Sequence, residues 1–309
     1  NASNPSAHLI ENAPENPAEP PTFVMLLRKQ LETGRIAAVR QEGRDRIIHL
    51  DIDASEQGKN VRADVKVLGD AKASLSALTN AVRPARHTAW IESFATDEAE
   101  EWEKVIEKEI HPTDGKLHMG EVVRRVSEAT NHNAVLVTDV GQNQMVGVRY
   151  FQYTQTRSVV TSGGLGTMGF GLPAAIGAKL GAPDRTVCLF VGDGGLQMTI
   201  QELGTIMQER LDVKIILLNN HFLGMVRQWQ ELFFNERYSA TEMENPDFVA
   251  IARAFRIASR EVSRREELDE AVEEMMATDG PYLLVADVEK CGIIYPMVPA
   301  GASISNILM

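Results

Sequence analysis

Short apolar runs alternate with amphipathic segments from about residue 112 onward. The runs are rich in Val, Ile and Leu and have the length of strands buried on both faces. They predict strands at 134–139, 158–162, 186–191, 213–219 and 282–288, with a weaker one near 257–260. Helical spacing separates them, at 116–130, 142–150, 170–180, 197–211, 246–255 and 264–277, the last opened by a capping box of Ser263 with Glu266. This alternation predicts an α/β fold: a doubly wound parallel sheet with helices on both faces.

The chain before residue 112 divides into three parts of different character. Residues 1–21 hold five prolines among Asn, Ala and Glu, which is typical of a loosely ordered segment. Residues 22–85 predict a partial second α/β domain, with helices over 23–46 and 70–82 and short strands at 47–52 and 65–67. Residues 86–111 contain an acidic amphipathic helix over 90–110, in which Trp102, Val105, Ile106 and Ile110 share a stripe. A linker helix is favoured there over an acidic docking surface, and residues 112–309 form the main domain with a carboxy-terminal tail.

Composition narrows the class of protein. The chain has 309 residues, of which 44% are hydrophobic and 24% charged, as in folded soluble proteins. Its net charge of −12 argues against a nucleic-acid binder, which needs a basic face. No apolar run approaches the roughly 18 residues of a membrane span. Two cysteines, Cys188 and Cys291, are too few for a disulfide framework and favour a reducing cytoplasm.

A glycine-rich stretch at 164–169 fits the G-x-G-x-x-G pattern of dinucleotide-binding folds. The acid that should bind ribose about 20 residues later is Asp184. It falls in a turn before the next predicted strand, whereas the pattern needs it at the end of that strand. A nicotinamide site is therefore disfavoured, and close helix–strand packing at Gly171 and Gly177 is an alternative explanation of the glycines.

A second motif lies at the ends of two successive predicted strands. Gly192-Asp193-Gly194 ends one, and Asn219-Asn220 ends the next. Right-handed crossovers bring the carboxyl ends of parallel strands to one edge of the sheet, so Asp193 and Asn220 should converge there. Carboxylate, carboxamide and carbonyl oxygens suit Mg²⁺, which readily shares its ligands with phosphates. The pattern predicts a magnesium and diphosphate site.

A GDG, a spacer and then NN is the signature of thiamine diphosphate enzymes. Four further stretches closely resemble the large catalytic subunit of acetolactate synthase, also called acetohydroxyacid synthase. They are TSGGLGTMGFGLPAAIGAKLG (161–181), QMTIQELGTIMQERLDVKIILLNN (197–220), FLGMVRQWQELFF (222–234) and YPMVPAGA (295–302). The resemblance covers roughly residues 47 to 309, the carboxy-terminal part of that family.

The resemblance implies the cofactor site. It makes Asp193, Asn220 and the Phe222 carbonyl magnesium ligands, with Gly192 and Gly194 beside the diphosphate. The implied neighbours of the cofactors are Met168, an apolar prop that keeps thiamine diphosphate bent, Gln142 and Gln144 at the cofactor edge, and Gly166 near a flavin ring.

The resemblance also implies a substrate pocket and a flavin site. Met225 and Trp229 would line the pocket for the second 2-keto acid, with Trp229 expected in a loop past the end of the strand predicted at 213–219. The residues placed near FAD are Asp51, Ile52, Glu56, Gly69 and Asp70, for which a solvated turn is the alternative. A lone Trp or a turn acid carries no such role without the motif.

The activity implied is that of a transferase in branched-chain amino acid biosynthesis. Pyruvate is decarboxylated, and its two-carbon unit is joined to a second 2-keto acid, pyruvate or 2-ketobutyrate. The family uses thiamine diphosphate, Mg²⁺ and FAD, and forms homodimers or homotetramers with a possible small regulatory subunit. Other thiamine diphosphate decarboxylases or carboligases, and a non-catalytic cofactor-binding fragment, are the alternatives.

The sequence departs from the family in one respect that matters. The family's activating glutamate belongs to an amino-terminal domain that has no counterpart here, so no catalytic residue is assigned and the chain alone is expected to be inactive. Glu121 and Glu231 stay open as substitutes, whereas Glu202 is expected to point away. Gly195 stands where the family often has serine, a change expected to leave magnesium binding intact.

Overall fold

The computed structural model describes residues 48–59, 63–83, 86–290, 292–299 and 307–308. The loosely ordered segment predicted over 1–21 and the helix predicted over 23–46 lie outside these residues. The chain divides into two compact units, residues 1–88 and 89–309, which are considered separately.

The described part of the first unit contains two strands and a helix, all of them predicted. Strands β1 (Ile48–Asp51) and β2 (Val65–Leu68) pair in parallel, and helix α2 (Ala71–Ala81) follows β2. Asp70 ends the turn after β2, and its carboxylate accepts a hydrogen bond of 2.9 Å from the Ala73 N–H. This N-cap satisfies one of the donors left open at the start of α2.

The acidic helix is confirmed, with an irregular middle. It comprises α3 (Thr88–Glu101), the π-helical η1 (Trp102–Ile106) and α4 (Glu107–Ile110). The predicted apolar stripe is buried only at its end: Ile110 is buried and Ile106 packs against the core, but Trp102 is exposed. No residue of α3 or η1 is buried, so only the end of the acidic helix packs on the core.

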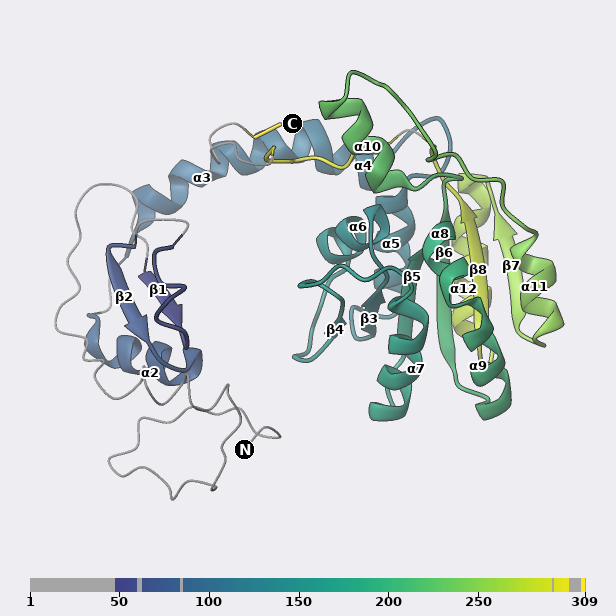
Figure 1. Cartoon of the computed structure of the whole chain (residues 1–309), viewed down its shortest axis with the longest axis horizontal. Coiled ribbons are helices and arrows are strands. Elements are labelled where there is room, and N and C mark those ends of the chain that lie inside the picture. Colours follow the sequence, from purple (N-terminus) through teal and green to yellow (C-terminus); the bar gives the residue numbers. More distant parts are fainter. Residues whose placement is uncertain (1–47, 60–62, 84–85, 291, 300–306, 309) are drawn as a thin grey trace. The chain divides into compact units, whose positions relative to one another are not determined.

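All six strands predicted after residue 112 form one parallel sheet (Figure 1). Its strands, in spatial order, are β4 (Val159–Val160), β3 (Val135–Thr138), β5 (Val187–Gly192), β6 (Val213–Asn219), β8 (Tyr282–Asp287) and β7 (Ala258–Val262). The chain runs outward from β3 to β4 and then returns to place β5 on the other side of β3. Sheets of this kind bind ligands beyond the carboxyl ends of their strands, near such a reversal.

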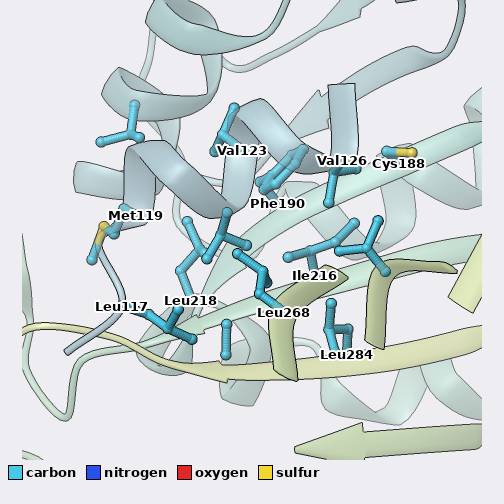
Figure 2. Close-up of a cluster of buried hydrophobic side chains, with 14 of the residues drawn as sticks. Leu117, Met119, Val123, Val126, Cys188, Phe190, Ile216, Leu218, Leu268 and Leu284 are labelled. Carbon is cyan, nitrogen blue, oxygen red and sulfur yellow. The ribbon is translucent and has the colours of Figure 1, made fainter. Parts of the chain in front are cut away.

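Helices cover both faces of this sheet, as predicted. One face carries α5 (Met119–Ala129), α6 (Gln142–Tyr150) and α12 (Leu268–Ala277); the other carries α7 (Gly171–Gly181), α8 (Asp193–Met198), α9 (Leu203–Glu209) and α11 (Phe248–Ala254). Alternate strand residues serve the two layers, so Ile216 and Leu218 pack under α5 and α12, whereas Ile215 and Leu217 pack under α9 and α11. Figure 2 shows the first layer. Full burial of both strand faces explains their continuous apolar sequences.

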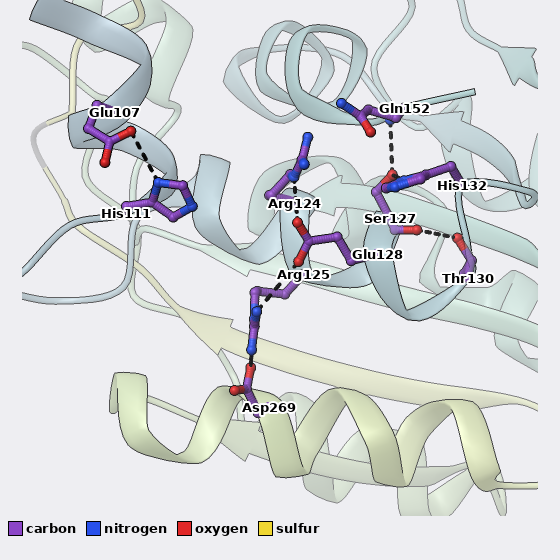
Figure 3. A network of polar contacts seen from close by, with 10 residues as sticks. All are labelled: Glu107, His111, Arg124, Arg125, Ser127, Glu128, Thr130, His132, Gln152 and Asp269. Atoms are coloured by element: carbon purple, nitrogen blue, oxygen red, sulfur yellow. Dashed lines mark hydrogen bonds and ion pairs between the residues drawn. The ribbon is translucent and has the colours of Figure 1, made fainter. Parts of the chain in front are cut away.

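Polar contacts tie α5 to its surroundings (Figure 3). Arg125 of α5 pairs with Asp269 of α12. The fully buried Ser127 hydroxyl accepts a 2.9 Å hydrogen bond from the Gln152 N–H, just after α6. These contacts fix α5 against two elements on the same face of the sheet.

Three local predictions were wrong. Helix α8 begins at Asp193, and a 3₁₀ turn, η2 (Ile200–Glu202), separates it from α9. No capping box forms at Ser263, because a 3₁₀ turn, η3 (Arg265–Glu267), precedes α12. Helix α10 (Gly224–Phe233) was not predicted at all.

The capping box lies instead at the start of α5, where the Glu121 carboxylate accepts a 2.6 Å bond from the His118 N–H. Glu109 of α4 completes this junction. Its Oε2 lies 3.1 Å from His118 Nδ1, and its Oε1 accepts a 2.8 Å hydrogen bond from the Gly120 N–H. The hydrogen bond to Glu109 raises the pKa of His118 above its ordinary 6.5, against the opposing effect of burial.

A raised pKa in the folded state makes the His118–Glu109 contact pH-dependent. Its stabilisation is fully present below pH 6.5 and is lost as pH rises through the higher folded pKa. The His118→Gln variant should therefore have a lower free energy of unfolding than the unchanged chain, and this deficit should be larger below pH 6.5 than well above it. Urea unfolding at several pH values measures the deficit. His111→Gln is the control, because His111 pairs with Glu107 in an exposed position. A deficit independent of pH would contradict this role for the imidazolium.

Candidate functional site

Asp193 and Asn220 meet at the carboxyl edge of the sheet, as predicted. Asp193 follows β5 and Asn220 follows β6, and these strands are neighbours. Both side chains are buried, with 1% and 4% of their surface exposed. A third residue joins the two strand ends: Asn245 Nδ2 donates to Asp193 Oδ2 at 2.7 Å and to Asn219 Oδ1 at 2.9 Å.

Opposing effects act on the pKa of the buried Asp193 carboxylate. Burial raises its pKa, while hydrogen bonds from Asn245 and the Gly194 N–H, and the charge of His221, act in the opposite direction. The carboxylate is thus desolvated but hydrogen-bonded in its ionised form. A cation at this position would replace the lost hydration.

Asn220 belongs to a chain of buried carboxamides. Its Oδ1 accepts a 3.2 Å bond from the Phe222 N–H, and its Nδ2 lies 3.3 Å from Gln142 Oε1. Gln142 Nε2 in turn donates to Gln228 Oε1 at 2.9 Å and to the Gly292 carbonyl at 2.8 Å. Gln142 therefore supports Asn220 directly and links it to the carboxy-terminal tail.

Gly224 allows this junction to close. A Cβ at residue 224 would lie 2.1 Å from Gln142 Oε1 and 2.8 Å from Asn220 Nδ2. No side chain fits there without displacing both amides. Gln144 lies apart from the cluster, donating to Thr161 Oγ1 at 2.8 Å.

Met168 lies over the Gly192–Gly194 turn. A Cβ at Gly194 would be 3.6 Å from Met168 Cε, and Met168 is half-buried. Its loop is anchored by Asp139, which is fully buried and accepts bonds from the N–H groups of Gly169 (3.1 Å) and Gly171 (2.7 Å). Sequence reasoning missed Asp139, although an acid directly after a buried strand is the signal that identified Asp193.

The close packing suggested for Gly171 and Gly177 occurs at only one of them. Gly171 meets Asp139 closely, since a Cβ there would lie 3.0 Å from the Asp139 backbone nitrogen, whereas Gly177 has open space around it. Close packing is thus confirmed for Gly171 and wrong for Gly177. Gly166 is exposed, and Asp184 lies in an exposed turn, as expected.

The predicted substrate residues lie on α10. Met225 is half-buried, and Trp229 is 39% exposed, with its ring 5.2 Å from that of Phe233 in an edge-to-face arrangement. The expectation that Trp229 lies in a loop was wrong. Gln228, next to it, points inward instead and accepts a 3.1 Å bond from the Ile294 N–H.

The donor set suits a hard cation. In the part of the chain that the structure describes, no cluster of three or more His, Cys, Asp or Glu side chains could hold a metal. A separate finding for the same residues is that no helix is long and apolar enough to cross a membrane. Asp193 offers a carboxylate, Asn220 an amide oxygen and Phe222 a carbonyl. One charged and two neutral oxygens fit Mg²⁺ when phosphates supply further ligands.

Comparison with known proteins agrees with this geometry. The family model of the thiamine pyrophosphate enzyme C-terminal TPP-binding domain matches residues 139–286, which span β5, β6 and both motifs. Residues 139–286 belong to the TPP-binding domain family of the thiamine pyrophosphate enzymes. A second family model, of the NFACT N-terminal and middle domains, matches residues 1–67, most of which lie outside the described residues.

Several curated thiamine pyrophosphate enzymes are similar to this chain over most of its length. The Escherichia coli acetolactate synthase isozyme 2 large subunit is 41% identical over 264 residues, which are 85% of this chain and 46% of that protein. Chloroplastic acetolactate synthase 1 of Nicotiana tabacum is 37% identical over 289 residues (89% and 42%), and the mitochondrial catalytic subunit of Saccharomyces cerevisiae is 36% identical over 282 (90% and 40%). The chain therefore spans less than half the length of these relatives.

The acids considered as activators of a thiamine pyrophosphate enzyme have other partners here. Glu121 bonds the His118 N–H and the guanidinium of Arg265, 2.8 Å away, so its buried carboxylate is fully engaged. Glu202 lies in the 3₁₀ turn η2 and accepts from the Thr205 hydroxyl at 3.0 Å. Glu231 is a half-buried residue on α10.

The residues expected near FAD gather in the first unit, at the carboxyl ends of β1 and β2. The Asp51 carbonyl accepts a 2.9 Å bond from the Gly69 N–H, and its carboxylate accepts from the Asp53 N–H at 2.8 Å. Asp70 caps α2, and Glu56 pairs with Lys59 at 2.6 Å. Ile52 is half-buried beside them. The fold brings these residues to one edge, and their role toward a flavin stays a prediction.

Proposed function

We propose that this chain is the diphosphate-binding part of an acetolactate synthase large subunit. The proposed reaction decarboxylates pyruvate and joins its two-carbon unit to pyruvate or 2-ketobutyrate. The observation that carries the proposal is the buried junction of Asp193, Asn245 and Asn219-Asn220 at the ends of β5 and β6. The relatives are named acetolactate synthases, which adds the type of reaction.

The residues of this junction fit the cofactor. Asp193, Asn220 and the Phe222 carbonyl would hold Mg²⁺, with Gly192 and Gly194 beside the diphosphate. Bound thiamine diphosphate supplies the electron sink for cleaving and forming carbon–carbon bonds. The chain itself desolvates the metal ligands, fixes the Asn220 amide through Gln142, and presses Met168 against the turn.

Further assignments belong to the same proposal. FAD would lie near Asp51, Ile52, Glu56, Gly69 and Asp70 of the first unit, and Gly166 of the second unit would be a cofactor-binding residue. Gln144 would border the thiamine site. The chain would form a homodimer or homotetramer, and the large-subunit names of the relatives support an additional small subunit, here proposed to be regulatory. The two-cysteine composition supports a cytoplasmic location, although the Nicotiana and Saccharomyces relatives are named chloroplastic and mitochondrial.

The 309-residue chain alone should form no acetolactate. Activation of the cofactor needs a carboxylate on its pyrimidine ring, and Glu121 is held by Arg265 and by the cap of α5. An acetoin assay with pyruvate, thiamine diphosphate, Mg²⁺ and FAD measures this. Turnover that Asp193→Ala abolishes would contradict the expectation.

A chimera tests the proposed function itself. Residues 47–309 are joined to the preceding part of the E. coli isozyme 2 large subunit, and acetolactate formation is expected. Its Asp193→Ala variant is the matched control and should be inactive. A chimera that melts cooperatively and binds thiamine diphosphate, yet makes no acetolactate, would contradict the proposal.

Trp229→Leu in the active chimera should change the ratio of the two products and leave decarboxylation intact. The exposed indole on α10 can contact the second substrate, while the metal site lies among buried side chains. Competition between pyruvate and 2-ketobutyrate measures the ratio. Val226→Ala, also at an exposed position of α10, is the control. An unchanged ratio with lost decarboxylation would contradict this role.

A further inference from the structure

We propose that Asn245 is a positioning residue that aims the Asp193 carboxylate at the metal. The inference rests on the proposed function. Asn245 lies outside both motifs, 52 residues after Asp193. It reaches the site from the segment that connects α10 to α11.

Every hydrogen-bonding group of the Asn245 amide that faces the site has a partner. Its two N–H groups serve Asp193 Oδ2 (2.7 Å) and Asn219 Oδ1 (2.9 Å). Its oxygen accepts a 3.0 Å bond from Gln197 Nε2. Only one orientation of the amide satisfies an acceptor-only carboxylate and the Gln197 donor together, so its direction is fixed.

The carboxylate depends on this amide for its rotation. Asp193 Oδ1 accepts a 2.9 Å bond from the Gly194 N–H, and Oδ2 accepts from Asn245. With both oxygens engaged, the carboxylate plane is fixed and its remaining lone pairs face a defined direction. Without Asn245, the carboxylate would lose its one side-chain donor and keep only backbone hydrogen bonds, from Gly194 and His221.

The backbone around Asn245 is fixed on both sides. Before it, the Met243 N–H donates to the His221 carbonyl at 2.9 Å, which holds the segment against the turn after β6. After it, Pro246 restricts Asn245 to extended conformations, and Asp247 caps α11 through the Ala250 N–H at 2.8 Å. The amide is therefore placed before any metal arrives.

Metal affinity measures this role without turnover. Mn²⁺ binding to the full chain is followed by electron paramagnetic resonance in the presence of thiamine diphosphate. Asn245→Leu keeps the shape and removes the donors without adding charge, so Mn²⁺ affinity should fall about 10- to 100-fold, as for other residues that orient metal ligands. The spectrum of the remaining bound Mn²⁺ should also change. Gln201→Leu, at an exposed position of η2, is the matched control and should bind as the unchanged chain does.

Gln197→Leu provides a second measurement if Asn245→Leu does not fold. It removes the donor to the Asn245 oxygen but leaves both donations from Asn245, so affinity should fall by a smaller factor. Unchanged Mn²⁺ affinity and spectrum in a folded Asn245→Leu chain, or in Gln197→Leu where Asn245→Leu does not fold, overturn the inference and leave the proposed function standing. If the unchanged chain binds no Mn²⁺ with thiamine diphosphate, the proposed function fails instead.

Discussion

Asp193→Ala should abolish metal-dependent binding of thiamine diphosphate to this chain. Asp193 is the only carboxylate among the three proposed magnesium ligands, and it lies buried where water cannot replace it. Loss of a direct ligand should weaken metal binding by more than the roughly 100-fold seen for supporting residues. Calorimetric titration of thiamine diphosphate, with and without Mg²⁺, measures the effect.

Two variants separate charge from shape at this position. Asp193→Asn keeps the size of the side chain and removes its charge, and it should lose most of the metal dependence too. Asp184→Ala removes an acid in an exposed turn and should bind normally. Magnesium-dependent binding that survives Asp193→Ala would contradict the assignment of the site.

Asp139→Ala should destabilise the fold and weaken cofactor binding together. Asp139 accepts hydrogen bonds from two buried N–H groups, those of Gly169 and Gly171. Each unsatisfied buried donor costs about 1–3 kcal/mol, so with two donors the free energy of unfolding should fall by about 2–6 kcal/mol. The loop that carries Met168 loses its anchor at the same time.

Urea unfolding and calorimetry measure the two effects of Asp139→Ala. Asp139→Asn retains one acceptor oxygen and should lose less stability than the alanine variant. Asp184→Ala again serves as the control, because its exposed carboxylate accepts no hydrogen bond in the described structure. Full stability of Asp139→Ala, or normal cofactor binding despite a freed loop, would contradict the anchoring role.

The sheet could be predicted because its strands are buried on both faces. The stretches Val187–Gly192 and Val213–Asn219 are almost entirely apolar, which amphipathic helices are not. Helix α10 was not predicted, although Met225, Trp229 and Phe233 recur every four residues, as on one face of a helix. The residue that the helix buries, Gln228, is polar, so the apolar spacing does not mark the inward face. Its position depends on amide contacts with Gln142 and the tail that no local pattern contains.

The candidate site was predicted only where motif and topology coincide. Asp193 and Asn220 follow adjacent strands, and the parallel topology brings them together. Asn245 lies in a turn-like Glu-Asn-Pro-Asp stretch, where asparagine is common for local reasons. Its contact with Asp193 spans 52 residues and depends on how the segment before α11 folds back. Spacing along the sequence contains no signal of that kind.

A crystal structure of the chain with Mn²⁺ and thiamine diphosphate tests the Asp193 site most directly. Mn²⁺ replaces Mg²⁺ and is located by its anomalous scattering. The predicted result is an anomalous peak about 2.0–2.2 Å from a carboxylate oxygen of Asp193 and from Asn220 Oδ1, with the diphosphate on its other side. A diphosphate bound away from the ends of β5 and β6, or a peak that Asp193 does not contact, would contradict it.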